Sequence, residues 1–470
     1  MCVNIDGNIE LQNIICHTFL CAQGAEMKVV VVGCTHAGTA AVKNILKQDS
    51  SVQVSVYEKN DYVSFLSCGI ALYVGGVVKD VNGLFYSSPE ELVSLGANVF
   101  MEHEVLSINY EDKTIEVKNL TTQEVKLDTF ERLILATGSW PIIPNIDGIY
   151  SKNVLLSKNF NQANEIIAAS SHAQKIIVVG AGYIGVELAE AFELMGKDVV
   201  LIDGETRIMP KYLDPEFTNI AEKAFMDHGV HLALGQKVKE FKYQDGIVTH
   251  IVTDKETFET DLVIMCIGFR PNQKLYQGFL ETTPNGALIV NEYMQTSNED
   301  VYACGDCINI FYNPTSEHRY IPLATNAVRT GTLAGLNVIK NHVKYQGTQG
   351  TSGIKIYDLS IASTGLTEGV ARDLMINYDT VIIKDHNRPE FMPDYDDVLL
   401  KIVFDKQTRR VLGGQILSTY DLTDMMNTLS IVIQNKMTVE QLAFVDFFFQ
   451  PHFNKPWNLL NTAALQALNK

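Results

Sequence analysis

Residues 175–185 read KIIVVGAGYIG, a short apolar run that meets three glycines. The run predicts a strand, and the spacing of Gly180, Gly182 and Gly185 is that of a dinucleotide-binding turn that opens a helix. In such a turn the first glycine bends the chain, the second admits a pyrophosphate, and the third lets helix and strand pack closely. Asp203 ends the next apolar strand, where a carboxylate binds an adenosine ribose and repels a 2′-phosphate. This unit is therefore predicted to bind NADH rather than NADPH.

Residues 28–33 read KVVVVG and begin a second copy of the pattern. Its turn, GCTHAG, has Thr35 in place of the second glycine, but Glu58 stands 20 residues past Gly38, at the end of the next strand. The first glycines of the two copies are 147 residues apart, whereas one strand–helix–strand unit takes about 30 residues. We therefore predict an α/β protein with two Rossmann-like domains and two bound dinucleotides.

The composition excludes some classes of binding partner and indicates the cellular location. Lys and Arg number 37 against 55 Asp and Glu, a net charge of −18, so neither nucleic acid nor an anionic membrane is expected as a partner. No apolar stretch approaches the ~18 residues of a membrane span, and residues 1–26 lack the basic start of a secretory signal. Eight cysteines in 470 residues do not suggest a disulfide framework, which predicts a cytoplasmic protein. His228 and His231 lack a nearby cysteine, so no metal is expected.

One cysteine lies where chemistry is expected. Cys68 belongs to SFLSCG, residues 64–69, just after the first strand–helix–strand unit, where the reactive end of a bound dinucleotide would reach. A thiol near helix N–H groups has a lowered pKa and reacts as the thiolate. A buried structural cysteine is the equal alternative. Cys304 and Cys307 have C-x-x-C spacing, but their context favours Asp306 as the chemical residue and the cysteines as bystanders.

Over residues 27–470, these features resemble the flavoprotein disulfide reductases that bind two dinucleotides. ATGS at 136–139 and the segment 304–306 look like FAD motifs of that superfamily. SFLSCG, together with FFFQP at 447–451 and KPWN at 455–458, resembles its peroxide and oxygen reductase branch, most closely the water-forming NADH oxidases.

The resemblance implies a domain order. A joint rich in Gly, Gln and Thr at 347–353 also predicts a boundary. The expected parts are an N-terminal extension (1–26), an FAD-binding domain in two pieces (27–149 and 271–348), an NAD-binding domain (150–270) and an α+β C-terminal dimerisation domain (349–470).

The resemblance also implies site residues. Cys68 and His36 are the expected catalytic pair, with His36 bonding the oxidised thiol or peroxide. Asp306 would bond the ribitol chain, and Tyr183 would gate the nicotinamide pocket beside Glu187. Residues expected to bind FAD are Gly33, Thr35, His36, Ala37, Gly38, Glu58, Lys59, Cys68, Ala136, Thr137, Gly138, Ser139, Asp306, Leu323, Ala324 and Thr325. Residues expected to bind NADH are Gly180, Gly182, Tyr183, Ile184, Gly185, Glu187, Asp203, Tyr212 and Gly268.

The same resemblance implies single-cysteine chemistry. Dithiol relatives carry a second cysteine five residues after the first, where this chain has Tyr73, and their His-Pro motif is reversed here at Pro451-His452. The implied activity is reduction of O2 to water by two NADH through a flavin hydroperoxide, while Cys68 cycles between thiolate and sulfenic acid.

Other readings of the same residues stay open. The first alternative activity is that of an NADH peroxidase, and the second, which the residues support less, is that of a coenzyme A disulfide reductase. A non-enzymatic alternative is a flavoprotein that changes shape with NADH and signals to a partner. The aromatic run at 447–449 predicts either core or an interface, and a homodimer or a dimer of dimers is expected.

Overall fold

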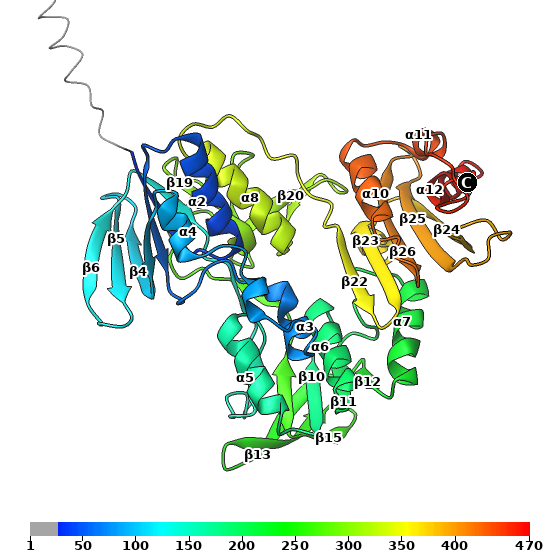
Figure 1. Cartoon of the computed structure of the whole chain (residues 1–470), viewed down its shortest axis with the longest axis horizontal. Coiled ribbons are helices and arrows are strands. Elements are labelled where there is room, and N and C mark those ends of the chain that lie inside the picture. The colour runs from blue at the N-terminus through cyan, green and yellow to red at the C-terminus, as the bar shows by residue number, and fades with distance from the viewer. Residues whose placement is uncertain (1–26) are drawn as a thin grey trace, which may run out of the picture.

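Five parallel strands form the first sheet, four from the N-terminal part of the chain and one from much later (Figure 1). The structure, a computed structural model, describes residues 27–470, so the expected extension at 1–26 lies outside it. Val29, Val30 and Val31 in the middle of this sheet are fully buried, as expected of a parallel strand covered on both faces. The strand order is β19 (Val301–Ala303), β7 (Arg132–Leu135), β1 (Lys28–Val32), β2 (Gln53–Glu58) and β3 (Asn98–Met101).

Two helices distant in sequence cover one face of this sheet. Helix α2 (His36–Gln48) follows β1 and packs against α8 (Ala324–Asn337). A Cβ at Gly331 would collide with the backbone oxygen of Ala37, so glycine lets the helices touch. The same domain contains η1 (Ser67–Gly69), α3 (Ile70–Val74), η2 (Val81–Leu84), α4 (Pro89–Ser94), β4 (His103–Asn109), β5 (Thr114–Asn119), β6 (Val125–Thr129), β8 (Ser139–Pro141), β17 (Phe269–Pro271), β18 (Leu288–Ile289), η3 (Gly305–Cys307), β20 (Ile308–Tyr312) and β21 (Glu317–Arg319).

A second parallel sheet repeats the plan of the first. The strand from Lys175 pairs on one side with the strand that ends at Asp203 and on the other with the strand at Leu262. Its order is β12 (His231–Leu234), β11 (Asp198–Asp203), β10 (Lys175–Val179), β16 (Leu262–Met265) and β9 (Val154–Leu156). It carries helices α5 (Phe160–Ser170), α6 (Tyr183–Leu194) and α7 (Pro215–Asp227), with a small antiparallel sheet of β13 (Val238–Gln244), β14 (Ile247–Thr253) and β15 (Thr257–Glu259).

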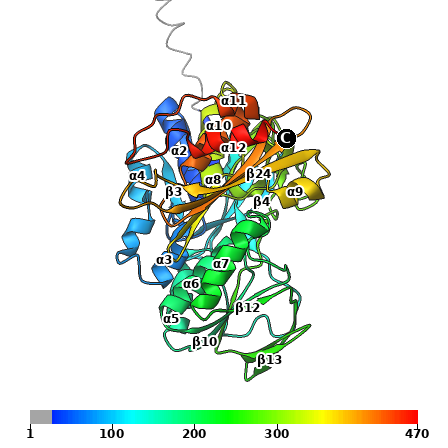
Figure 2. The same cartoon turned by 90° about the vertical axis from the view of Figure 1, so that its right-hand side faces the viewer.

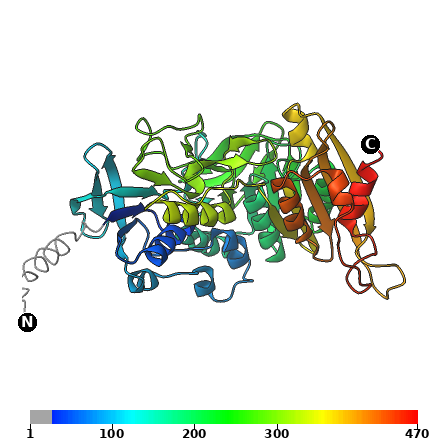
Figure 3. The same cartoon turned by 90° about the horizontal axis from the view of Figure 1, so that it is seen from above.

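The C-terminal part is an antiparallel sheet covered by helices. It lies at one end of the molecule, and the β4–β6 sheet lies near the opposite end (Figure 3). Its strand order is β22 (Ser352–Ile356), β23 (Leu359–Gly365), β26 (Val411–Ser418), β25 (Asp397–Asp405) and β24 (Tyr378–His386). Its helices are α9 (Glu368–Asp373), α10 (Met425–Gln434), α11 (Val439–Ala443) and α12 (Leu459–Ala467). The predicted α/β fold class is confirmed.

A buried ionic cluster joins the second and third units, where α7 lies beside the C-terminal sheet (Figure 2). Lys401 of β25 is only 1% exposed, and its Nζ lies 3.2 Å from an oxygen of Asp214, which directly precedes α7. The same Nζ lies 2.6 Å from Glu368. Asp214 also accepts a hydrogen bond of 2.6 Å from the Gln415 amide. A buried charge is stable only when it is paired in this way, so the two units are held together at this point.

Within residues 27–470, no helix has the length and apolar character that a membrane span requires.

Candidate active site

The first glycine turn is closed by a buried carboxylate. Gly33 has a φ of +91°, and a Cβ there would collide with the backbone oxygen of Ala136, so the turn requires glycine. Glu58, at the end of β2, accepts a 2.6 Å hydrogen bond from the Cys34 N–H. Burial raises the pKa of Glu58, and bonds from Asn60 and Cys34 oppose that rise. The expected turn is formed, with its acid facing the loop.

The second turn has the same plan in a more open setting. Asp203 accepts a 2.5 Å bond from the Ala181 N–H and a 2.7 Å bond from the Glu205 N–H. A Cβ on Gly185 would collide with the backbone oxygen of Gly180, as helix–strand packing demands. Among the described residues, no atom lies within 4 Å of a Cβ built on Gly182, so open space faces this end of α6. A phosphate approaching the N–H groups there would find the place free.

An ion pair links the two nucleotide-type units. Asp306 accepts hydrogen bonds from Ser139 Oγ at 2.8 Å and from Lys158 Nζ at 3.1 Å. Burial works against ionisation of Asp306, but Lys158 and Ser139 outweigh it and hold its pKa below the ordinary value. Lys158 also lies 4.5 Å from the centre of the Phe269 ring. The sequence analysis missed Lys158, whose only signal is its place between strand β9 and the N-cap of α5.

Cys68 sits in η1, immediately before the short helix α3. Of the five cysteines within residues 27–470, it is the exposed one. Partial desolvation, and after it the Glu187 carboxylate, raise the pKa of its thiol, while Lys158 opposes them. The expected lowering of this pKa is wrong. Helix α3 has five residues, and Glu187 and Asp306 both disfavour the thiolate.

The segment before Cys68 is fixed by two unusual features. Ser64 is fully buried in the left-handed region, with a φ of 60°, and its hydroxyl donates to the Ser87 carbonyl at 2.7 Å. Its own N–H donates to the Cys34 carbonyl at 3.1 Å, which ties this segment to the first turn. Four aromatic rings then pack with centres 5.3 to 5.9 Å apart, from Tyr62, Phe65, Phe85 and Phe160. Neither feature was found from the sequence.

His36 begins α2 and makes contact with one aromatic side chain. Its Nδ1 lies 3.1 Å from the hydroxyl of Tyr86, and the rings stack with centres 5.7 Å apart. Burial lowers the pKa of His36, although Asp306 opposes the change. The Nε2 atom is buried and has no hydrogen-bond partner among residues 27–470. A neutral imidazole with one free nitrogen is therefore available to a bound group.

The start of α6 carries the expected nicotinamide-side residues. The ring of Tyr183 lies 4.6 Å from that of Tyr212, and its hydroxyl is 2.8 Å from Ser352 Oγ in the C-terminal sheet. Glu187 lies one turn further along α6. Burial, and then the neighbouring Glu190, raise the pKa of Glu187 to about 7.

Other predicted residues are held by local contacts. Lys59 lies 5.1 Å from the centre of the Trp140 ring. Leu323, Ala324 and Thr325 form the N-terminus of α8, the helix that packs against α2. Gly268 has a φ of +110°, and its carbonyl accepts a 2.9 Å bond from the Ile142 N–H. Thr137 exchanges hydrogen bonds with Asn272, which holds the segment after β7.

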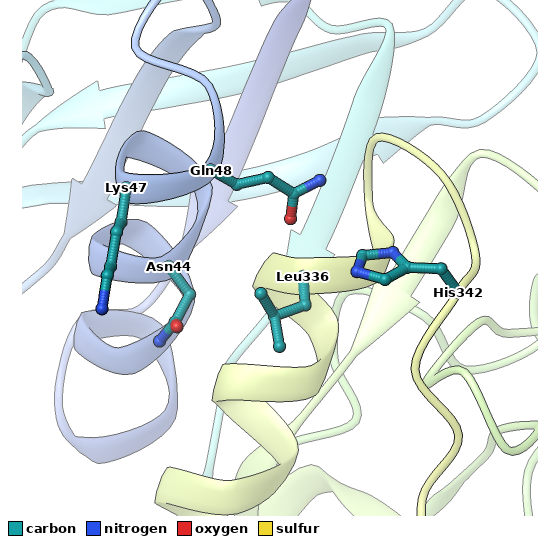
Figure 4. A pocket seen from close by; sticks show the side chains of 5 residues that line it. All are labelled: Asn44, Lys47, Gln48, Leu336 and His342. Atoms are coloured by element: carbon teal, nitrogen blue, oxygen red, sulfur yellow. The ribbon is translucent and has the colours of Figure 1, made fainter.

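A surface pocket lies elsewhere, between the C-terminal ends of α2 and α8 (Figure 4). It has a volume of about 300 Å³ and is lined by Asn44, Lys47, Gln48, Leu336 and His342. It contains none of the residues that sequence analysis assigned to chemistry.

Comparison with known proteins identifies the family of this chain. Residues 27–331 match the family model of the pyridine nucleotide-disulphide oxidoreductases, and residues 351–459 match the model of their dimerisation domain. An NADH oxidase from Enterococcus faecalis is 54% identical, over 94% of this chain and 99% of its own length. The solved structure of a water-forming NADH oxidase from Lactobacillus brevis, bound to NADH, has a TM-score of 0.93 at 52% identity and covers 94% of this chain and 98% of its own.

A more distant relative has a different name. A CoA-dependent NAD(P)H sulfur oxidoreductase from Pyrococcus furiosus is 30% identical, over 93% of this chain and 98% of its own length. The family resemblance inferred from the sequence is confirmed, and the chain belongs to the pyridine nucleotide-disulphide oxidoreductases, an FAD-dependent family of oxidoreductases.

Proposed function

We propose that this protein is an NADH oxidase that reduces O2 to water, with two NADH consumed per O2. The observation that carries the proposal is a single exposed thiol, Cys68, on which the Glu187 carboxylate acts. The Lys158–Asp306 ion pair acts on both Cys68 and His36, and the Nε2 of His36 has no partner among residues 27–470. The other four cysteines in residues 27–470 are free and less accessible. The similarity to NADH oxidases supports the choice of activity. Free thiols throughout this part of the chain support a cytoplasmic location.

The first turn and its surroundings suit FAD. The N-terminus of α2 and the partnerless Nε2 of His36 are groups that a bound cofactor would satisfy, and the Glu58 carboxylate stands at the same loop. We assign Asp306, held by Ser139 and Lys158, to a polar chain of FAD. FAD supplies the hydride chemistry when bound.

The second turn suits NADH. Gly182 leaves space for a pyrophosphate at the start of α6, and Asp203 presents its carboxylate where an adenosine ribose would lie. A 2′-phosphate would meet that negative charge, which favours NADH over NADPH. Tyr183 and Tyr212 then flank the nicotinamide side of the site.

Cys68 supplies the second redox centre. Its thiolate attacks one oxygen of hydrogen peroxide and breaks the O–O bond, which gives a sulfenic acid and, after one proton is taken up, water. Two electrons and two protons then return the sulfenic acid to the thiol and release a second water. With the two electrons that reduce O2 to peroxide, the total is four, the electrons of two NADH. We assign His36, whose buried Nε2 has no hydrogen-bond partner among residues 27–470, to bond the peroxide or the sulfenic acid.

The test is Cys68→Ser in the FAD-loaded enzyme. NADH oxidation is expected to continue while hydrogen peroxide accumulates, one per O2 consumed. Added catalase returns half of the oxygen, so it will halve the net O2 uptake of the variant and leave that of the wild type unchanged. A variant that still forms only water would show that Cys68 has no such role.

The same oxygen trace separates the rival activities. A wild-type enzyme that takes up no O2 with NADH, but oxidises NADH when peroxide is added, is a peroxidase. The similarity to the Pyrococcus enzyme makes coenzyme A disulfide a third substrate to assay. NADH that bleaches the flavin without turnover of any of the three would favour the signalling alternative.

We further propose that the C-terminal domain forms a homodimer. Phe444, Phe448, Phe453 and Trp457 expose between 53% and 69% of their surface between α11 and the start of α12. Exposed aromatic groups of this size mark interaction surfaces, and the dimerisation-domain match covers residues 351–459. Light scattering is expected to give twice the chain mass of 52.3 kDa, or four times for paired dimers. Phe448→Glu is expected to lower it to that of one chain.

A further inference from the structure

Helix α6 carries three carboxylates at intervals of one turn. Glu187, Glu190 and Glu193 are three residues apart, so they lie along one side of the helix and span roughly 9 Å. Each is partly buried. Such a row is unfavourable if every member is ionised, and burial raises the pKa of Glu190 as well as that of Glu187.

The inner end of this row lies at the proposed active site. The Glu187 carboxylate acts on the Cys68 thiol more strongly than any other charge. Helix α6 also packs directly on α3, the helix that follows Cys68, and a Cβ on Gly75 would lie 3.2 Å from that of Ala191. Glu187 is therefore the member of the row that belongs to the proposed active site.

The outer end reaches the surface at the end of α7. His228 Nδ1 lies 3.4 Å from Glu193 Oε2, and the histidine side chain is 43% exposed against 20% for the glutamate. The His228 ring stacks on Tyr357, with centres 3.7 Å apart and planes within 9°. Tyr357 in turn donates its N–H to Glu190 at 2.6 Å. The turn between β22 and β23 thus holds both the carboxylate and the imidazole.

Two polar atoms along this row are incompletely hydrogen-bonded. Glu193 Oε2 and the Tyr357 hydroxyl are buried without a well-aligned hydrogen bond among the described residues, although Glu193 lies close to both His228 and the Tyr357 hydroxyl. Buried polar groups are normally satisfied by protein or by ordered water. The remaining charge that acts on Glu190 is Lys355 of β22, which favours its ionised form, as His228 does, whereas Glu193 disfavours it.

We propose that His228, Glu193 and Glu190 form a proton route from solvent to Glu187, with water completing the steps between them. The proposal rests on the proposed oxidase activity. The balance O2 + 2 NADH + 2 H+ → 2 NAD+ + 2 H2O requires two protons from solvent per O2. This route enters through the boundary between the second and third units, where the exposed His228 stacks on Tyr357. Glu190 and Glu193 are relay residues that touch neither substrate nor flavin.

The route is tested with Glu193→Gln and His228→Ala in the FAD-loaded enzyme. Above pH 7, kcat for O2 reduction is expected to fall about tenfold, less than the roughly hundredfold or more that a direct general acid or base supplies, because water can partly replace a relay residue. The solvent deuterium isotope effect on kcat is expected to rise. Added imidazole is expected to restore activity in His228→Ala, because a mobile acid replaces the lost side chain. Glu193→Asp, which keeps a carboxylate, is expected to retain most of the activity.

Half-reactions separate this route from the activity itself. Transfer of hydride from NADH to FAD takes no proton from solvent, so its anaerobic rate is expected to be unchanged in Glu193→Gln, while the reaction of the reduced enzyme with O2 slows. His231→Asn and Glu165→Gln, exposed groups outside the row, are matched controls. A loss of kcat in Glu193→Gln and His228→Ala that is independent of pH and unaffected by imidazole, or no loss at all, would overturn the route. Absence of O2 uptake by the wild type would instead overturn the proposed activity.

Discussion

The two glycine turns have the same arrangement of strand, turn and acid, but they differ in how far the rest of the chain buries them. In each, a carboxylate at the end of the next strand accepts the N–H of the residue after the first glycine, Cys34 for Glu58 and Ala181 for Asp203. Glu58 is only 3% exposed, and helix α8 lies across the helix of its turn. Asp203 is partly exposed, and open space adjoins Gly182.

This difference matches the roles that we propose for the two turns. A cofactor that stays through many turnovers is best held in a turn that the rest of the chain covers. A substrate that leaves as NAD+ after each hydride transfer needs a turn with an open approach. The two turns are thus expected to respond differently to similar substitutions.

The largest effect is expected from Gly331→Ala, which disturbs the packing of α8 on α2, the helix that follows the first turn. Its Cβ would collide with the Ala37 backbone oxygen, so α8 must move away from α2. Overpacking of this kind costs roughly 1–3 kcal/mol. We expect a lower unfolding temperature and release of FAD, followed by flavin fluorescence during gel filtration. Gly83→Ala, where a Cβ meets no described atom within 4 Å, is the control. Equal FAD retention in both variants would contradict the covering role of α8.

Glu187→Gln, in the proposed active site, is expected to change how the stability of the protein depends on pH. The pKa of Glu187 in the folded protein is about 7, above the ordinary value of 4.5. Between pH 4.5 and pH 7 the folded protein therefore binds more protons at this residue than the unfolded chain does. Its stability therefore falls as pH rises from 4.5 to 7, by on the order of 2 kcal/mol. The variant loses this penalty. Its unfolding temperature is expected to exceed that of the wild type at pH 8 and to match it near pH 4.5. A constant difference across this range would show that the Glu187 pKa is unshifted.

Asp203→Asn removes the charge of the open turn and leaves one oxygen in place of the two that accept the Ala181 and Glu205 N–H groups. Loss of a charge-assisted hydrogen bond is expected to raise KM for NADH about tenfold. KM for NADPH is expected to fall, because the repulsion of its 2′-phosphate is gone. FAD content should stay unchanged, which separates the two turns. Steady-state kinetics with both nucleotides measures the effect, and an unaltered preference would remove Asp203 from the nucleotide site.

The smallest effect is expected from Gly182→Ala. Its φ of −78° and the free space around it allow alanine without strain, so the unfolding temperature should not change. The added methyl group would stand between the backbone and a pyrophosphate, and a rise of several-fold in KM for NADH is expected. A fall in unfolding temperature with unchanged KM would mean that Gly182 serves packing alone.

The sequence predicted features set by residues close together in the chain and missed contacts between residues that are distant in the chain. Both glycine turns and their acids follow from spacing within about 30 residues, because a strand–turn–helix unit fixes its own geometry. Lys158, Tyr86 and Ser352 belong to no motif, and each meets its partner only after distant segments pack together. The direction of the Cys68 pKa shift was mispredicted for the same reason, since the pKa is raised by burial and, after it, by Glu187 on a helix of another unit.

The cluster around Lys401 bears on how this enzyme could be re-engineered. A new nucleotide-binding unit grafted in place of residues 150–270 would bring its own residue to position 214, where Asp214 pairs with Lys401 and Gln415 of the C-terminal sheet. It would also change position 183, whose hydroxyl meets Ser352. The unit is therefore not an exchangeable module. A working chimera would have to transfer matching residues of the C-terminal sheet with it, Lys401 and Gln415 first among them.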